Sequence, residues 1–164
     1  MHILENVAVM EIVAGYVKSA TVEVFESMVM MEIAPGEPAY AGSRKIDSSI
    51  SSMIGLAGDL KGMVIVHCPD EVAKVITSEM LGMEIEQIDD DVKDALGEIA
   101  NMVAGGLKVS LVEQDCNVEL ALPSTVIGRS VRMSSGVGTK RVMVPFEIPS
   151  GEFGVEMNYV ISSV

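Results

Sequence analysis

Residues 94–108, DALGEIANMVAGGLK, predict an apolar, small-residue helix that a glutamate and an asparagine interrupt. At about 100° per residue, Glu98 and Asn101 fall on one side, with Gly105 one turn further along. The opposite side carries a broad stripe that predicts burial, formed by Val92, Leu96, Ile99, Val103, Leu107 and Ser110. The pair is therefore expected on the exposed surface of this helix.

Three glycines lie within the same helix, at positions 97, 105 and 106. Each costs about 1 kcal/mol relative to alanine in a helix interior, so their presence indicates that something approaches the helix closely. Packing of another element inside the fold would account for them, and so would a docking partner. At Gly105, on the side of Glu98 and Asn101, a side chain would obstruct such a partner.

Hydrophobic periodicity extends the prediction to the rest of the chain. Apolar residues at spacings of three and four, from Ile3 to Met28, predict a long N-terminal helix, which the prolines and glycine of residues 34–38 end. Alternating patterns predict strands, and caps such as Pro69, Gly82 and the acidic residues 88–91 bound two further helices. The expected elements are helix 3–29, strands 46–57 and 63–68, helices 69–81 and 88–112, and strands 141–148 and 155–162.

A faint internal repeat links the two long helices. VAGYVK at 13–18 and VAGGLK at 103–108 agree at four of six positions, with an offset of 90 residues. Each half also continues into a hairpin-like pair of strands whose second strand meets a proline, GDLKGMVIVHCP and GVGTKRVMVPFEIP. The pattern is compatible with a duplicated half-fold and equally with four identities that arise by chance.

Composition restricts the class of protein. A chain of 164 residues with 49% hydrophobic content suffices for one core, so residues 1–164 are expected to form a single domain. A net charge of −13 argues against binding to nucleic acid or anionic membranes, which need clustered Lys and Arg. Charged residues interrupt the first apolar stretch, which indicates a cytoplasmic protein without a membrane span. Two cysteines and two histidines predict no metal site in this chain.

Two other groups of reactive side chains are given structural roles. His67 and Cys68 are neighbours on a predicted strand and so point to opposite faces, which excludes a base and nucleophile pair. The serines at 48, 49, 51 and 52 have no histidine nearby in the sequence and are expected to line the polar side of a half-buried strand.

The motif around Glu98 and Asn101 resembles the signature helix of the CheC/CheX/FliY group of chemotaxis phosphatases, which is G-E-x-x-N-x-x-A-G. The order of the GDLKGMVIV hairpin, the PDEVAKVITSEMLG helix and LPSTVIGR is similar to CheX across essentially the whole chain. This resemblance implies an α+β fold: a mostly antiparallel sheet with long helices packed on it, built as two pseudo-related halves. It also implies an enzyme, an aspartyl-phosphate phosphatase for phosphorylated CheY in chemotaxis and two-component signalling.

The resemblance assigns roles to the pair. Glu98 is expected to contact a lysine of CheY, and the amide of Asn101, being neutral, suits the orientation of the attacking water. Neither register of the repeat gives a second E-x-x-N, which is the CheX pattern of a single site. No cofactor is expected on this chain, since Mg²⁺ belongs to the partner regulator. CheX relatives form homodimers through edge strands, and residues 138–148, interrupted by Pro145, would be consistent with an edge.

Two other functions are compatible with the sequence. One is a non-catalytic module that binds response regulators and is related to the flagellar switch proteins. The retention of both Glu98 and Asn101 argues against it, because a pure binder does not need the amide. The other is a generic α+β domain in which a Glu and an Asn three residues apart on a solvated helix are incidental.

Overall fold

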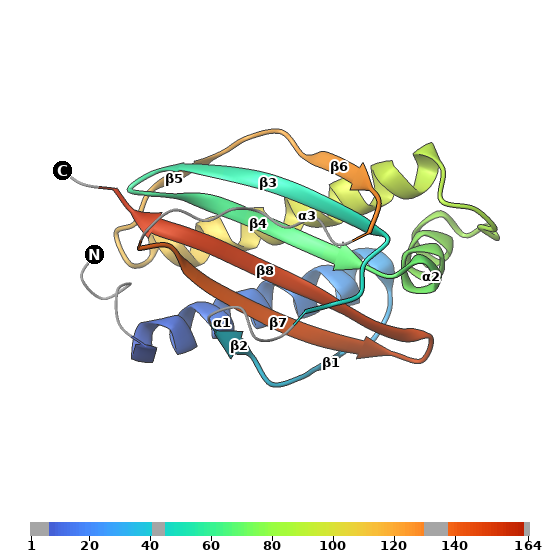
Figure 1. The fold of residues 1–164 in the computed structure, drawn as a ribbon, viewed down its shortest axis with the longest axis horizontal. Coiled ribbons are helices and arrows are strands. Elements are labelled where there is room, and N and C mark those ends of the chain that lie inside the picture. The colour runs from blue at the N-terminus through green and yellow to red at the C-terminus, as the bar shows by residue number, and fades with distance from the viewer. Residues whose placement is uncertain (1–6, 41–44, 130–137, 163–164) are drawn as a thin grey trace.

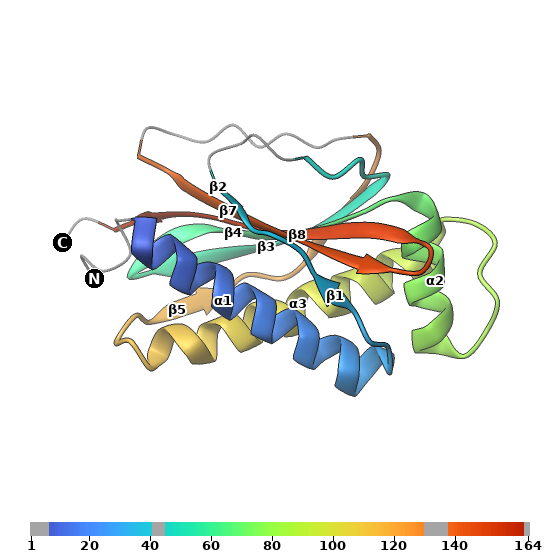
Figure 2. The ribbon, with the colours of Figure 1, turned by 90° about the horizontal axis from the view of Figure 1, so that it is seen from below.

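A computed structural model describes residues 7–40, 45–129 and 138–162, and within them places three helices on one face of an antiparallel sheet (Figures 1 and 2). The helices are α1 (Val7–Val24), extended by a π-helical segment η2 (Phe25–Val29), α2 (Asp70–Leu81) and α3 (Asp90–Val112). The strands are β1 (Ala34–Pro35), β2 (Ala39–Tyr40), β3 (Ile50–Gly58), β4 (Leu60–Cys68), β5 (Val118–Leu120), β6 (Ser124–Ile127), β7 (Lys140–Ile148) and β8 (Gly151–Ile161). These elements confirm the predicted α+β class.

The sheet is built from two hairpins that meet at its centre. Its order is β1-β7-β8-β4-β3-β5, with β2 also pairing with β7 and β6 with β3. The β3–β4 hairpin turns tightly after Gly58, whose φ of +133° is accessible to glycine but strained for other residues. The second hairpin joins β7 to β8 in the same antiparallel sense.

The topology confirms the duplicated half-fold. The two runs matched by their prolines are not equivalent, however, because one forms β4, the second strand of its hairpin, and the other forms β7, the first strand of its hairpin. The first half consists of α1 and β1 to β4, and the second consists of α3 and β5 to β8. Each half sends its two short strands across to the other: β1 and β2 pair with β7, while β5 and β6 pair with β3. The second strands of the two hairpins, β4 and β8, lie side by side in the middle. The repeated hexamers therefore occupy equivalent positions in α1 and α3.

The N-terminal helix departs from the expected pattern at its C-terminal end. Met28 belongs to the predicted buried stripe, but its side chain is 45% exposed, whereas Val29 is fully buried. The helix widens to the π form over Phe25–Val29 and ends at Met30 in the left-handed region. A π turn holds more residues than an α turn, so the buried face advances by about one residue. Ile3, at the start of the same stripe, lies outside the described residues.

The caps of the other two helices agree closely with the sequence. The carboxylate of Asp89 accepts hydrogen bonds from the backbone N–H groups of Asp91 and Val92 and so caps α3. Gly82 ends α2 in the left-handed conformation. Pro69 is the N-cap of α2, one residue before the helical position predicted for it, because its ψ of 159° is extended.

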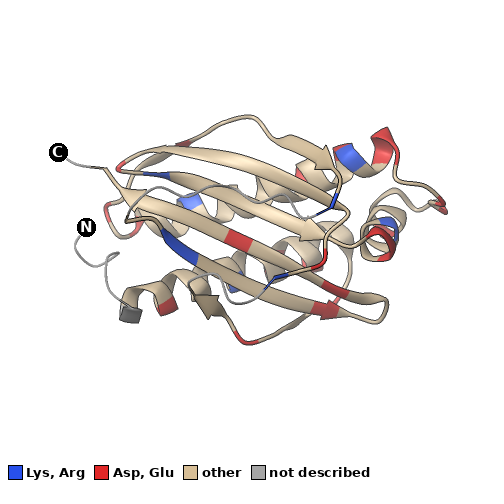
Figure 3. Ribbon diagram, viewed as in Figure 1, with Lys and Arg blue, Asp and Glu red and all other residues tan. Residues whose placement is uncertain are grey.

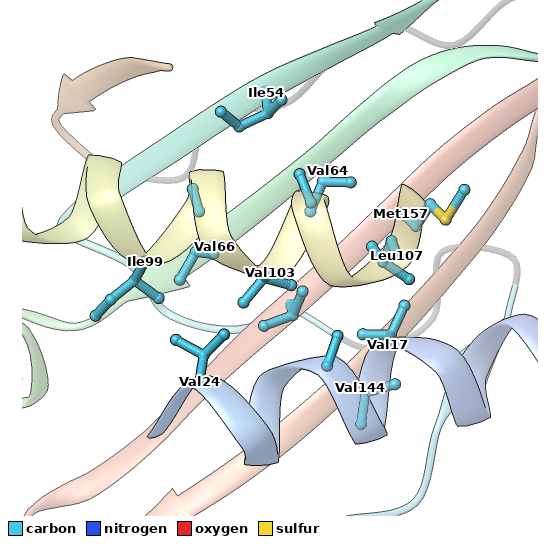
Figure 4. Packing of buried hydrophobic residues seen from close by; sticks show 14 of the residues in the cluster. Val17, Val24, Ile54, Val64, Val66, Ile99, Val103, Leu107, Val144 and Met157 are labelled. Carbon is cyan, nitrogen blue, oxygen red and sulfur yellow. The ribbon is translucent and has the colours of Figure 1, made fainter. Parts of the chain in front are cut away.

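The core lies between the helices and the sheet. Figure 4 shows side chains of α1 and α3 meeting those of the central strands, among them Val17, Val24, Ile99, Val103, Leu107, Ile54, Val64, Val66, Val144 and Met157. By length and composition α3 could span a membrane, but half of its most apolar window is buried inside the protein. It is therefore the central core helix.

The expectation that residues 138–148 form an edge strand is wrong. Over most of this run the chain forms β7, which pairs with β8 on one side and with β1 and β2 on the other. Gly36 donates its backbone N–H to the carbonyl of Pro145 at 2.8 Å, between the two short pairings. The presence of Pro145 gave no local signal that β1 and β2, from the first half of the chain, pair with this side of β7.

Candidate functional site

The side chains of Glu98 and Asn101 are exposed on the side of α3 that faces away from the core. Their neighbours Gly97, Ile99 and Ala100 are buried, so the exposed strip is narrow and follows the helical period. Three residues correspond to about 4.5 Å along the helix axis, which places the carboxylate and the amide side by side. The structure thus has the pair where the spacing predicts it.

Neither side chain is occupied by an internal contact. Within residues 7–40, 45–129 and 138–162, Glu98 and Asn101 form no hydrogen bond or ion pair. The backbone that carries them is nevertheless rigid, because α3 is capped at Asp89 and buried along its other side. The pair is a preformed polar surface that is available to a partner.

The three glycines of α3 have different surroundings. A Cβ at Gly106 would lie 3.0 Å from Cβ of Ala20, so this glycine permits the close approach of α1. A Cβ at Gly97 would make ordinary contacts with Thr125 and Pro123, at 3.6 and 3.7 Å. At Gly105 a Cβ would meet nothing within 4 Å. Packing against α1 explains why residue 106 is a glycine. No contact among the described residues requires a glycine at residue 105, where the missing side chain leaves open space beside Asn101.

The equivalent face of α1 lacks this pair. The 90-residue offset places Glu11 opposite Asn101 and Gly15 opposite Gly105. Glu11 is exposed, and Gly15 has the same open surroundings as Gly105. The two helices therefore share an open glycine on this face, but α1 has a carboxylate where α3 has the amide.

Glu98 and Asn101 stand on an exposed helix surface and do not line the cleft that the described residues form. This cleft of about 400 Å³ lies at the opposite edge of the sheet, lined by residues 34–37, Pro145, Glu147 and Glu152. Small substrates are usually bound in concave pockets, so an exposed pair suits a substrate that is itself a protein with its own cavity.

The charge around the pair is predominantly negative. Figure 3 shows acidic positions along the loop after α2 and at the start of α3. Around the start of α3 these are Glu84, Glu86, Asp89, Asp90, Asp91 and Asp94. Toward the other end of the helix, Lys108 lies 3.7 Å from Glu119. This field attracts a basic group on a partner toward Glu98.

A second polar cluster lies on the face of the sheet away from the helices, and it corrects the expectation for the serines. Ser51 Oγ is 3.0 Å from Nδ1 of His67, whose Nε2 is 3.2 Å from Oε1 of Glu156. Arg141 donates to the same carboxylate oxygen at 2.9 Å. Ser51 is fully buried, so no substrate reaches this serine, histidine and glutamate, and the cluster is structural. Cys68 points into the core on the opposite face, as predicted.

Comparison with known families gives one match over most of the chain. The family described as chemotaxis phosphatase CheX matches residues 50–147, which include Glu98 and Asn101. The chain is also similar to the CheY-P phosphatase CheX of Thermotoga maritima. The two are 32% identical over 114 residues, which is 69% of this chain and 74% of the relative.

Solved structures extend the similarity to nine tenths of the chain. A putative chemotaxis protein from Desulfovibrio vulgaris Hildenborough superposes with a TM-score of 0.82 and 30% identity, covering 90% of this chain and 96% of its own. A chain of the Borrelia burgdorferi CheX–CheY–BeF3–Mg²⁺ complex gives 0.75 and 26% identity, covering 91% and 97%. The short strands and the three helices are thus part of a shared fold.

The buried cluster predicts a pH-dependent stability. Burial raises the pKa of Glu156, but the hydrogen bonds from His67 and Arg141 outweigh it and lower the pKa from 4.5 to about 2. A carboxyl whose pKa is lower in the folded state stabilises the fold above its unfolded pKa, and this contribution is lost as the pH falls from 4.5 through about 2. We expect Glu156→Gln to lower the free energy of unfolding by ~2 kcal/mol at pH 7 and to remove that part of the acid dependence.

Urea denaturation at several pH values checks this prediction. The matched control is Glu79→Gln, which changes an exposed glutamate of α2 and should leave the profile unchanged. Equal acid dependence in the wild type and in Glu156→Gln would contradict the assignment.

Proposed function

Because the chain belongs to the CheX family of chemotaxis phosphatases, we propose that it hydrolyses the aspartyl phosphate of a CheY-type response regulator at Glu98 and Asn101. The observation that carries the proposal is the exposed, unengaged pair on a rigid helix, inside the segment that matches the family. We further propose that residues 1–164 form one phosphatase domain, which the coverage of nine tenths of the chain by related structures supports.

The chemistry determines what the pair must supply. An aspartyl phosphate is an acyl phosphate: water attacks phosphorus in line, the bond to the aspartyl oxygen breaks, and carboxylate and inorganic phosphate leave. The transition state is largely dissociative, so catalysis consists mainly of positioning and charge stabilisation. Asn101 performs the positioning, with its amide oxygen accepting a hydrogen bond from the water and its NH₂ group free to donate. A neutral amide adds no negative charge beside the phosphoryl oxygens.

Charge stabilisation comes from the regulator. Among the described residues, no group of three His, Cys, Asp or Glu side chains could hold a metal ion. We place the Mg²⁺ on the regulator, beside the phosphoaspartate, consistent with the Mg²⁺ in the Borrelia burgdorferi CheX–CheY complex. When bound there, the ion neutralises charge on the phosphoryl oxygens.

Glu98 has a different role from Asn101. A carboxylate placed against the phosphoryl group would repel it, because like charges interact strongly at such distances. One turn from the amide, Glu98 instead forms an ion pair with a lysine at the regulator's active site. This contact fixes the angle at which the regulator docks on α3, and the acidic residues at the start of the helix support it.

We also propose that the chain acts in the cytoplasm as a homodimer that pairs through β6. Within the described residues, β6 pairs with β3 on one side only, so its other side is available to a second copy. Val126 and Ile127 on this strand are partly exposed. Sedimentation at micromolar concentration should give the mass of two chains, and a monomer throughout that range would contradict this proposal.

Asn101→Ala tests the catalytic role of the amide. We expect turnover of the phosphorylated regulator to fall on the order of 10²–10³-fold, because the water loses its orienting group. Affinity for the regulator should remain unchanged, since the removed group acts in the transition state. The phosphoaspartate decay rate at saturating enzyme measures the first quantity, and calorimetry with the beryllofluoride-loaded regulator measures the second. Gln114→Ala, an exposed amide just beyond α3, is the matched control, and full turnover by Asn101→Ala would exclude Asn101 from the mechanism.

Glu98→Gln tests the docking role of the carboxylate. Removing the charge should raise KM about three- to tenfold at low ionic strength, and the difference should shrink as salt screens the ion pair. The kcat should change little. Glu113→Gln makes the same substitution just beyond the C-terminal end of α3 and should leave KM unaltered. A fall in kcat at constant KM would instead assign Glu98 to the chemical step.

A further inference from the structure

The segment between β5 and β6 contains one residue more than the strand opposite it. On β3, Leu56 pairs with Leu120 and Met53 pairs with Ser124. Two residues separate the partners on β3, whereas three separate them on the other strand: Ala121, Leu122 and Pro123. The register therefore shifts by one residue, which defines a β-bulge. Bulges redirect side chains and are found beside active sites more often than elsewhere.

The bulge turns Leu122 into solvent. Its side chain is 88% exposed, which is the highest value among the large hydrophobic residues described. On one side of Leu122, Ala121 donates its backbone N–H to the carbonyl of Gly55 at 2.9 Å. On the other side, Pro123 has a ring-restricted φ and no N–H that could donate to β3. Leu122 is thus held outward by an ordered backbone, although a regular strand would alternate its side chains between the two faces.

The same segment runs beside α3 and passes the proposed site. Near one end, Glu119 lies 3.7 Å from Lys108, and near the other, Thr125 Oγ1 donates to the carbonyl of Lys93 at 3.5 Å. Pro123 lies against Gly97, one turn before Asn101. These contacts place the bulge beside the part of α3 between Lys93 and Lys108, which includes Asn101. They lie on the side of α3 opposite Gly106, which faces α1.

Beyond Asn101 the exposed side of α3 carries an open glycine and two exposed valines, together with Lys108, which pairs with Glu119. Gly105 is open, and Val109 and Val112 are 62% and 45% exposed on the same side of the helix. The start of the helix is acidic instead. The surface around the pair thus has an acidic end and an end where exposed valines lie beside one ion pair, so a partner with a basic group and an adjacent apolar patch fits it in one orientation.

We propose that Leu122 is a docking residue for the receiver domain of the phosphorylated regulator, where it contacts an apolar patch beside the phosphoaspartate. This inference rests on the proposed function, because the surface around Leu122 is continuous with the Glu98 and Asn101 site. Burial of an exposed leucine on docking supplies affinity that does not depend on the state of the phosphoryl group. Glu98 then sets the orientation, Asn101 acts on the water, and Leu122 contributes affinity.

The test compares Leu122→Asp with Val160→Asp, which makes the same charge change at an exposed position of β8. Three quantities are measured: kcat and KM for the phosphorylated CheY-type regulator, the Kd for the beryllofluoride-loaded regulator with Mg²⁺, and the sedimentation coefficient of the chain alone. We expect Leu122→Asp to raise KM and Kd about tenfold, since an apolar contact is replaced by a charge that must be desolvated. The kcat, the oligomeric state and the Tm should stay at wild-type values.

Each other outcome has a defined meaning. An unchanged Kd and KM would overturn the role of Leu122 and leave the phosphatase assignment intact. A lower kcat at constant KM would assign the residue to the chemical step, which also overturns docking. A change in sedimentation coefficient would show that Leu122 contacts a second copy of the chain instead. Failure of the wild type to accelerate dephosphorylation would refute the proposed function itself, while the Kd comparison would still decide the docking contact.

Discussion

Burial of one side of α3 against α1 and the sheet governs the orientation of the Glu98 and Asn101 side chains. The helix contributes Leu96, Ile99, Val103 and Leu107 to the core, and Gly106 lets α1 approach to contact distance. A helix fixed along its whole length has a fixed azimuth, so its helical period determines where every other side chain points. Glu98 and Asn101 face solvent because they lie on the side of α3 opposite the buried residues. Both are on a helix, so no loop has to become ordered before a partner binds.

The two-fold repeat explains how the sheet beneath α3 is completed. Each half completes the sheet of the other with its short strands, so neither half is expected to bury its hydrophobic surface alone. The same repeat gives α1 an equivalent exposed face, with Gly15 open as Gly105 is. Only α3 presents an amide there, since Glu11 occupies the equivalent position on α1. The two long helices of the duplicated scaffold therefore differ at both positions of the pair, since Ala8 is opposite Glu98 and Glu11 is opposite Asn101.

Local periodicity was sufficient to predict most of this architecture. Sequence windows of ten to twenty residues contain the patterns that predict the buried stripe on α3, its Asp89 cap and the alternating strands. The same windows predict the exposure of Glu98 and Asn101. The features that the sequence did not predict include contacts between residues far apart in the chain. His67 and Glu156 are 89 residues apart, so their burial on the covered outer face of the sheet has no local signal. The π turn that exposes Met28 and the bulge that exposes Leu122 each depend on one extra residue, which a strict period does not anticipate.

We infer that the exposed amide of Asn101 completes a site that another protein supplies, so that catalysis exists only in the complex. This inference can be tested by the decay rate of the phosphoaspartate on a CheY-type regulator, with Mg²⁺ and a saturating amount of the wild-type chain. We expect decay to accelerate on the order of 10²-fold or more over the regulator alone. An unchanged decay rate, with calorimetry showing the regulator fully bound, would contradict it and would identify a binding module without phosphatase activity.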